Sequence, residues 1–511
     1  QEHLVVLPVA LPLMTGALLL LFDERRHAVK AAVSVASTLT LTAVAVALLQ
    51  VADAPAAQVY RLGNWPAPFG IVLVADRLAA VMVLLATVLG LASSVFSLAR
   101  WHRAPGRFPA LLQFLLMGLN GAFLTGDLFI LFVFFELLLA ASYGLALHGS
   151  GIGRVRETLH YIVVNLAASL LFLVGVSLIY GVTGTLNMAQ LAQRISEVAT
   201  ADRALLQSGA TLLGVAFLVK AAAWPLGFWL PGTYAAASAP SAALFAILSK
   251  VGIYAILRLG HLFFGDGAAM EFLFYAGVLT VLFGAAGMLA SQSLGHLAGY
   301  SLMVSSGTLL AVVSRAQPAL TSAALFYLLA SSLGVAALFL LNELLQRARA
   351  PGADLLAVTA EAFGIHEQEP EERPGPAIPA TMALLGIAFM GCALLVAGLP
   401  PLPAFVGKLA MFASLLEARP VPWTAWTLVA LLTLSGLASL IALARAGIGI
   451  FWAHERSTPR VLLVEMAPVA ALLALGLGLT VAAGPAMRYL GDAAQGLHAP
   501  RAYVEAVVPR R

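Results

Sequence analysis

Charged residues are scarce in this sequence. Only 10% of its 511 residues are Asp, Glu, Lys or Arg, whereas 61% are hydrophobic, and the mean hydropathy is +0.95. Soluble globular proteins carry about 25% charged residues, so the composition excludes an ordinary soluble protein. Apolar stretches long enough to cross a bilayer, which takes about 20 residues, recur along nearly the whole chain. They leave no segment long enough for a separate soluble domain.

Several chemical signatures are also missing. The single cysteine, Cys392, lies in an apolar stretch, which excludes a disulfide framework and a cysteine metal cluster. The sequence has no Walker A motif, no dinucleotide glycine fingerprint and no cluster suited to haem or iron–sulfur ligation, so we expect no cofactor and no metal. The arginines are scattered through short loops without interleaved aromatics, which argues against a nucleic-acid partner. Energy for any transport must come from ion gradients or partner subunits.

The apolar runs predict an all-α polytopic membrane protein with about fourteen transmembrane helices. The runs lie near residues 4–22, 29–50, 71–99, 109–126, 128–147, 158–182, 208–230, 240–260, 270–291, 299–314, 319–343, 377–416, 423–444 and 462–483.

Two of these runs are interrupted by proline. The seventh contains Pro225, and the twelfth, too long for one plain helix, contains Pro400 and Pro401. Proline removes a helical hydrogen bond, so helices 7 and 12 are expected to be broken inside the membrane. Two broken helices at comparable places in the two halves indicate a transporter built from inverted repeats. Packing kinks are the simpler alternative for either break alone.

The distribution of Lys and Arg between spans predicts an orientation. Loops after odd-numbered spans hold fourteen basic residues and loops after even-numbered spans hold six. The positive-inside rule then places the odd loops in the cytoplasm and both termini outside, although a basic C-terminal tail argues mildly against this. Residues 183–207 contain an amphipathic stretch expected along the membrane surface, and residues 350–376 form an acidic, Pro-rich loop.

Lysine is rarer than arginine, and its placement is informative. Only four of the 28 basic residues are lysines, and three of them, Lys220, Lys250 and Lys408, fall well inside predicted spans. Arginine cannot release its proton at accessible pH, whereas burial can lower the pKa of a lysine by about 3 to 5 units. A single buried lysine could be a structural cation. Each costs roughly 2.5 to 3.5 kcal/mol to insert, so three together indicate proton handling.

Other titratable groups complete the candidate site. Glu136 is the deepest acidic residue, and we expect it to pair with a buried lysine; a structural ion pair is the alternative. His160 and His296 lie near span ends and could extend a proton path, or could be interfacial histidines. Asp76 and Asp127 begin spans, where capping of the helix N-terminus is the expected role.

At these residues the sequence resembles the large proton-conducting antiporter subunits shared by Mrp (Pha) cation/proton antiporters and the membrane arm of respiratory complex I. The similarity is strongest to the D-subunit branch of the Mrp complex. The matching segments are TGDLFILFVFFELLLAASYGL around Glu136, LVKAAAWPLGFWLPGTYAAASAPSAALFAILSKVGIYAILRL around Lys220 and Lys250, and GLPPLPAFVGKL, which contains Lys408.

The resemblance implies a division of the chain. An N-terminal three-helix segment (1–108) precedes two inverted five-helix repeats (109–260, helices 4–8, and 261–450, helices 9–13), and a C-terminal helix and tail follow (451–511). It also implies a proton relay, which in this chain consists of Glu136, Lys220, Lys250 and Lys408. Some complex I relatives carry Glu at the last position, so Lys408 favours the antiporter branch.

The chain departs from the family at two positions. In LGHLAGYS, His296 stands where many relatives have a basic pair, and His160 replaces a lysine common near the start of the sixth span. Both changes leave the central relay intact.

The resemblance implies a subunit that acts with other membrane subunits in Na⁺/H⁺ or K⁺/H⁺ antiport in the bacterial inner membrane, as a secondary transporter rather than an enzyme. One alternative is a pump subunit of a complex I-like or hydrogenase-like redox assembly. Another is a structural membrane subunit that conducts nothing, against which the lysine distribution argues.

Overall fold

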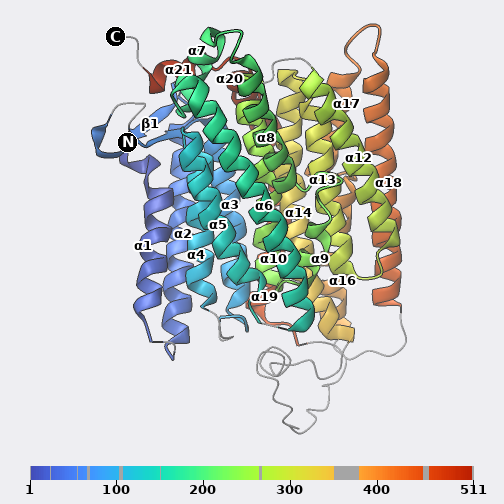
Figure 1. Ribbon diagram of the computed structural model, residues 1–511. Coiled ribbons are helices and arrows are strands. Elements are labelled where there is room, and N and C mark those ends of the chain that lie inside the picture. The colour runs from blue at the N-terminus through green and yellow to red at the C-terminus, as the bar shows by residue number, and fades with distance from the viewer. Residues whose placement is uncertain are drawn as a thin grey trace.

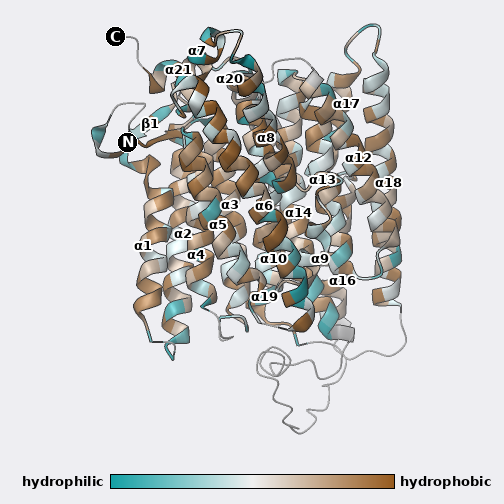
Figure 2. Cartoon of the chain, viewed as in Figure 1, coloured by the Kyte–Doolittle hydropathy of each residue, from teal (hydrophilic) through white to brown (hydrophobic). Residues whose placement is uncertain are grey.

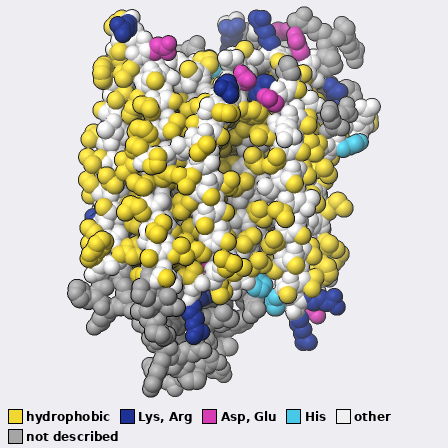
Figure 3. Space-filling view, turned by 180° about the vertical axis from the view of Figure 1, so that it is seen from behind, with side chains coloured by type: hydrophobic (Ala, Val, Ile, Leu, Met, Phe, Trp, Pro, Cys, Tyr) yellow, Lys and Arg dark blue, Asp and Glu magenta, His cyan; other side chains and the backbone are white. Residues whose placement is uncertain are grey.

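The computed structural model describes residues 2–23, 25–54, 56–65, 70–102, 107–149, 151–263, 268–349, 379–452 and 460–508. Helices stand side by side as a bundle with two ends (Figure 1). In these ranges eleven helices are long and apolar enough to cross a membrane, and three shorter helices are also apolar. Hydrophilic residues gather toward the two ends (Figure 2), and hydrophobic side chains cover the middle of the rear face (Figure 3). The predicted polytopic α-helical class is confirmed.

The first part of the bundle contains six apolar helices and a small sheet. The helices are α1 (Leu7–Leu21), α2 (His27–Val51), α3 (Arg77–Ser97), α4 (Phe108–Leu124), α5 (Leu128–Ala146) and α6 (Ile152–Thr183), with single turns η1 (Glu2–Val5) and η2 (Leu62–Asn64).

The sheet was not expected from the sequence. Strands β1 (Gln58–Arg61) and β2 (Val72–Ala75) pair antiparallel, with Gln58 opposite Ala75. The predicted third span was therefore too long, because its first residues form β2. Helix α3 begins after Asp76, whose side chain accepts a hydrogen bond from the backbone N–H of Ala79 at 2.9 Å and so caps the helix.

Helices 7 and 12 are broken, as predicted. The seventh span consists of α8 (Arg203–Lys220) and α9 (Trp229–Ala236), and Pro225 lies in the non-helical segment between them. The twelfth consists of α16 (Pro379–Ala397) and α17 (Pro403–Leu415), separated by residues that include Pro400 and Pro401. The eighth span is also interrupted, between α10 (Ala239–Phe245) and α11 (Leu248–Phe263).

The remaining spans build the second half and the core. They are α12 (Ala268–Ala290), α13 (Leu294–Val313), α14 (Pro318–Arg349), α18 (Trp423–Phe451) and α19 (Leu463–Val481). The apolar stretches of α13 and α14 are almost entirely buried, as is that of α10 and α11, whereas α12 and α18 are largely exposed on one side. The helices α10, α11, α13 and α14 thus form the most deeply buried part of the bundle.

One end of the bundle, here called the terminal face, carries extra structure; the other end is called the opposite face. Helix α7 (Met188–Arg194), followed by the turn η3 (Ile195–Glu197), forms within the predicted amphipathic segment, and Ala189 on it is buried with Val72 and Val507. Helix α21 (Arg501–Val507) packs against α7, and α20 (Ala483–His498) packs against α3 and α14 at the same end (Figure 1), where the sequence had indicated only a tail. The acidic loop at residues 350–376 lies outside the described residues.

Candidate functional site

Lys220 is the last residue of α8, immediately before the first helix break. Its side chain is buried, its ammonium has no hydrogen-bonding partner within the described part of the protein, and Nζ lies 5.0 Å from the centroid of the Phe135 ring. A cavity of about 20 Å³ adjoins it, lined in part by Tyr161, Asn165 and Trp229. That volume suits about one water molecule. The cavity is therefore enclosed, and although its other walls are apolar, these polar groups and the ammonium can hold a water.

Glu136, on α5, follows Phe135 and lies close enough to Lys220 for Coulombic attraction. The charged atoms do not meet: in the described residues Glu136 Oε1 is buried without a hydrogen-bonding partner, as is Lys220 Nζ. The ring of Phe135, rather than the carboxylate, contacts the ammonium. The structure thus brings the two residues into one region without the direct contact that the sequence had suggested.

Aromatic side chains surround this region and carry further polar atoms. The hydroxyl of Tyr161 lies 2.7 Å from Ser142 Oγ, and its ring lies beside Trp229 with centroids 5.1 Å apart. Tyr143 OH and Trp229 Nε1 are buried without partners among the described residues. An unsatisfied buried polar atom costs about 1 to 3 kcal/mol, and in proteins such atoms are commonly satisfied by ordered water. The surroundings of Lys220 therefore favour hydration.

Lys250, on α11, is fully buried and held by neutral hydroxyls. Its ammonium donates to Ser305 Oγ at 2.9 Å and to Ser306 Oγ at 3.3 Å, and Ser305 in turn lies 2.8 Å from Ser331 Oγ on α14. Among the described ion pairs none includes Lys250. A lysine held by hydroxyls that both donate and accept is suited to exchanging protons rather than to neutralising a fixed charge.

Lys408 lies in the second turn of α17, and its side chain turns back across the second break. Its ammonium donates to the carbonyl of Ala397, the last residue of α16, at 3.0 Å. The C-terminus of a helix carries partial negative charge, which favours a cation there. The side chain is only 8% exposed, so it faces the bundle interior and not lipid.

The two breaks place their lysines on the same side. Helix α8 runs from the terminal face to Lys220, and α17 runs from its break back to the terminal face (Figure 1). Both lysines therefore lie on the terminal-face side of their breaks, which is the reversal that inverted repeats require.

The helices that carry the three lysines pack closely against one another or against α14. A Cβ on Gly252 of α11 would lie 2.5 Å from the Phe217 carbonyl of α8, and one on Gly407 of α17 would lie 3.1 Å from Cβ of Tyr327 on α14. The Tyr327 hydroxyl interacts with Ser305, the partner of Lys250. A series of polar groups thus leads from Lys250 toward the helix that carries Lys408.

Comparison with known proteins identifies a family whose matching region includes these residues. The sequence model of the family described as NADH:quinone oxidoreductase/Mrp antiporter, transmembrane, matches residues 125–437, which include Glu136, Lys220, Lys250 and Lys408. This chain belongs to that family. It is 53% identical to the probable K(+)/H(+) antiporter D subunit of Rhizobium meliloti (strain 1021), over 99% of this chain and 98% of the relative. It is 36% identical to the Na(+)/H(+) antiporter D subunit of Bacillus subtilis (strain 168), over 99% and 100%.

Solved structures show the same fold. A chain in the structure of the Mrp complex from Dietzia sp. DQ12-45-1b superposes with a TM-score of 0.86 at 27% identity, covering 99% of both chains. A chain of respiratory complex I from Thermus thermophilus superposes with a TM-score of 0.78 at 23% identity, covering 97% of this chain and 99% of the other. The latter likeness concerns the fold alone.

The other residues that the sequence analysis singled out make no hydrogen bond to the three lysines among the described residues. His160 and His296 are exposed, and His296 Nδ1 lies 2.8 Å from Ser293 Oγ. Asp127 caps α5 by accepting from the backbone N–H of Phe129 at 2.8 Å, and Asp76 caps α3, as expected for both. Neither histidine is connected to the buried lysines by a hydrogen bond among the described residues.

Asp76 has a second role that the sequence did not reveal. Its carboxylate pairs with Arg258 of α11, whose Nη2 lies 2.9 Å from Asp76 Oδ1 and also donates to Tyr254 OH at 2.9 Å. Burial raises the pKa of Asp76, but the adjacent guanidinium outweighs this effect and holds the pKa below its ordinary value. An arginine in an apolar run normally seeks such a partner.

Buried charges also meet at the opposite face. Arg347 on α14 pairs with Glu343 and, at 2.6 Å, with Glu465 at the start of α19; Trp101 Nε1 donates to Glu343 at 2.9 Å. Nearby, His148 is buried, with Nε2 3.0 Å from the Trp101 carbonyl. The sequence shows these charged residues at the ends of apolar runs. It does not show that they contact one another in the folded protein.

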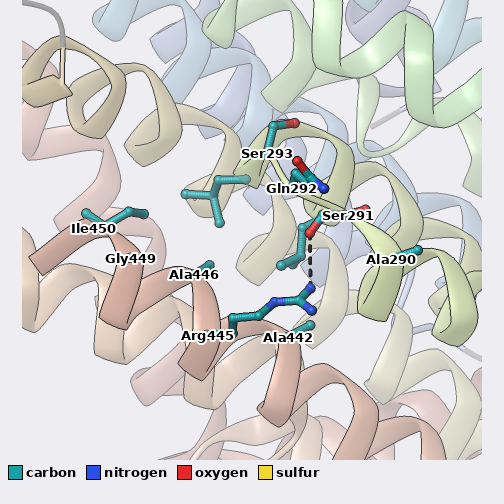
Figure 4. A pocket seen from close by; sticks show the side chains of 11 residues that line it. Ala290, Ser291, Gln292, Ser293, Ala442, Arg445, Ala446, Gly449 and Ile450 are labelled. Atoms are coloured by element: carbon teal, nitrogen blue, oxygen red, sulfur yellow. Dashed lines mark hydrogen bonds between the residues drawn. The ribbon is translucent and has the colours of Figure 1, made fainter. Parts of the chain in front are cut away.

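A larger cavity at the opposite face is separate from the lysines. It measures about 360 Å³ and lies between the α12–α13 turn and α18 (Figure 4). Arg445 donates across it to the carbonyls of Leu289 at 2.6 Å and Ser291 at 3.1 Å. This arginine thereby connects α18 to the end of α12, and none of the lysines Lys220, Lys250 and Lys408 lines the cavity.

Proposed function

We propose that this chain is the proton-translocating subunit of a multisubunit monovalent cation/proton antiporter in a bacterial cell membrane. The observation that carries the proposal is the arrangement of Lys220, Lys250 and Lys408: two buried lysines lie beside helix breaks, and the third is held by serine hydroxyls. Full-length similarity to proteins named as K⁺/H⁺ and Na⁺/H⁺ antiporter D subunits supports it. The protein would act as a secondary transporter, with no cofactor, beside other membrane subunits.

Each residue has its own role in the proposed proton transfer. Lys220 binds and releases a proton at Nζ, and the charge of nearby Glu136 favours the protonated ammonium; protonation of Glu136 removes that attraction and promotes proton release. Lys250 exchanges its proton with Ser305, whose hydroxyl both donates and accepts. Lys408 receives the proton near the Ala397 carbonyl. Water in the cavity beside Lys220 would complete the first step.

The exposed histidines are not needed in this path. His160 and His296 lie at the surface, and the proposed steps run only through the bundle interior. The two inverted repeats, residues 109–260 and 261–450, belong to the same proposal, because the matching positions of Lys220 and Lys408 relative to their breaks support them.

A pump subunit of a complex I-like redox assembly is the second candidate. The superposition on respiratory complex I favours it at the level of fold. The antiporter relatives, at 53% and 36% identity across the whole chain, favour antiport. Purification of the native complex separates the two, because flavin or iron–sulfur subunits in it would support the redox assembly.

Exchange measurements on the complete complex test the proposal. Lys220→Ala and Glu136→Ala should each abolish cation/proton exchange in everted vesicles while the complex still assembles, because each removes a titratable group from the interior. Lys30→Ala is the matched control, since Lys30 is a lysine in the first turn of α2 and outside the path. Normal exchange by both site variants would refute the relay. Loss of assembly in both, with no change in exchange per assembled complex, would show a structural pair instead.

A further inference from the structure

Glu157 is a carboxylate that the relay does not use, and it lies where the first broken helix meets the opposite face. It belongs to the second turn of α6, and it is partly buried. Its Oε2 occupies the space that a Cβ on Gly232 of α9 would need, so only glycine leaves room for the carboxylate there. Thr233 Oγ1 donates to the Glu157 carbonyl at 3.2 Å. No ion pair among the described residues includes Glu157.

A polar line leads from this carboxylate to Lys220. Glu157, Tyr161 and Asn165 are spaced by four residues, which places them on one face of α6 over about 12 Å. Tyr161 and Asn165 line the cavity beside Lys220, together with Trp229 of α9. Because Trp229 and Gly232 lie one turn apart on α9, two of the helices that line the cavity, α6 and α9, also meet at Glu157.

The guanidinium of Arg154, close to Glu157 on the same helix, is already hydrogen-bonded to backbone carbonyls. Arg154, one turn before Glu157 on α6, donates from Nε to the Ala236 carbonyl at 2.7 Å and from Nη1 to the His148 carbonyl at 3.0 Å. The other titratable groups close to Glu157 in sequence on α6 are the exposed Arg156 and His160 and the buried Tyr161, and Tyr234 follows Gly232 by two residues on α9. His160 is exposed on the outside of α6, so Glu157 is the acidic group best placed between solution and cavity.

We propose that Glu157 collects protons from solution at the opposite face and delivers them to Lys220 along the Tyr161–Asn165 side of α6. The inference rests on the proposed function. In each transfer an O–H bond of the Glu157 carboxyl breaks, a water in the line passes the proton on, and an N–H bond forms at Lys220 Nζ. The carboxylate is then free to take the next proton from solution.

Initial exchange rates of the intact complex, measured across neutral and alkaline pH, test this role. Glu157→Gln should slow exchange several-fold, and the deficit should grow as pH rises, because proton collection limits the rate when protons are scarce. Glu157→Asp should recover part of the rate. Gly232→Ala keeps the carboxylate but displaces it, so it should reproduce the defect. Glu417→Gln, an exposed carboxylate between α17 and α18, is the matched control and should behave as wild type.

The outcomes separate this inference from the relay itself. Wild-type rates for Glu157→Gln at every pH, with Lys220→Ala inactive, would overturn the role of Glu157 and leave the relay standing. A uniform loss with an unchanged pH profile and no recovery by Asp would show a structural role and also overturn it. If Glu157→Gln does not assemble, the pH profiles of Glu157→Asp and Gly232→Ala decide. Normal exchange by Lys220→Ala would instead refute the proposed function.

Discussion

Gly398→Ala should impair proton exchange without removing any titratable group. Gly398 follows the last residue of α16 with φ +74°, a left-handed conformation that favours glycine. A Cβ at this position would lie 2.9 Å from Lys408 Nζ and 3.0 Å from Lys408 Cε. The methyl group would therefore push the ammonium away from the Ala397 carbonyl, which it now contacts at 3.0 Å.

Two costs follow from this geometry. A left-handed non-glycine residue costs roughly 1 to 2 kcal/mol, which should appear as reduced stability of the folded protein. Loss of the hydrogen bond from a charged donor costs about 1.5 to 3 kcal/mol. Since about 1.4 kcal/mol corresponds to a factor of ten, a step that needs Lys408 in place should slow on the order of tenfold to a hundredfold.

The assay is initial exchange in everted vesicles, normalised to assembled complex. Gly478→Ala on α19 is the control, because a Cβ there meets nothing within 4 Å among the described residues. Gly436→Ala should have a smaller effect than Gly398→Ala, since its Cβ would lie 3.3 Å from Lys408 Nζ. Exchange by Gly398→Ala at the rate of the Gly478→Ala control would refute the assigned contact between Lys408 and the end of α16.

Two further predictions concern the Glu136–Lys220 pair and the pH dependence of protein stability. The double variant Glu136→Ala/Lys220→Ala should be no worse than either single variant, because both residues act in one step; additive losses in vesicle exchange would contradict this. Burial lowers the pKa of His148 from 6.5 to about 4, so the folded protein binds fewer protons there than the unfolded chain. The resulting stability is present above pH 6.5 and lost as pH falls toward 4, and His148→Phe should weaken that acid sensitivity in thermal unfolding of the purified protein. An unchanged acid dependence in His148→Phe would show that other groups cause it.

Much of the fold could be predicted because lipid imposes simple rules on sequence. Each span needs a long apolar run, and proline in such a run marks a break, which is why Pro225 and Pro400 located the discontinuous helices. The β1–β2 hairpin could not be separated from the third span, because the apolar strand Val72–Ala75 continues directly into an apolar helix. Only Asp76, as an N-cap residue, marked the boundary.

The lysines of the site could be found from their rarity, but their partners could not. Serines such as Ser305 and Ser331 are common in transmembrane helices, so the sequence does not mark these two. The packing of α13 against α14 brings Ser331 to Ser305, which accepts from Lys250. The expectation that Glu136 pairs with a buried lysine followed from charge alone. Sequence carries no information about the Phe135 ring, which occupies the space beside the ammonium.

Exchange by Lys250→Arg in the assembled complex tests most directly whether the buried lysines carry protons. The substitution keeps a positive charge beside Ser305 and Ser306, but a guanidinium does not release its proton at biological pH. We predict a complex that assembles in normal amount and exchanges no cations for protons. Exchange at the wild-type rate would show that Lys250 serves only as a fixed charge, and would contradict proton transfer through it.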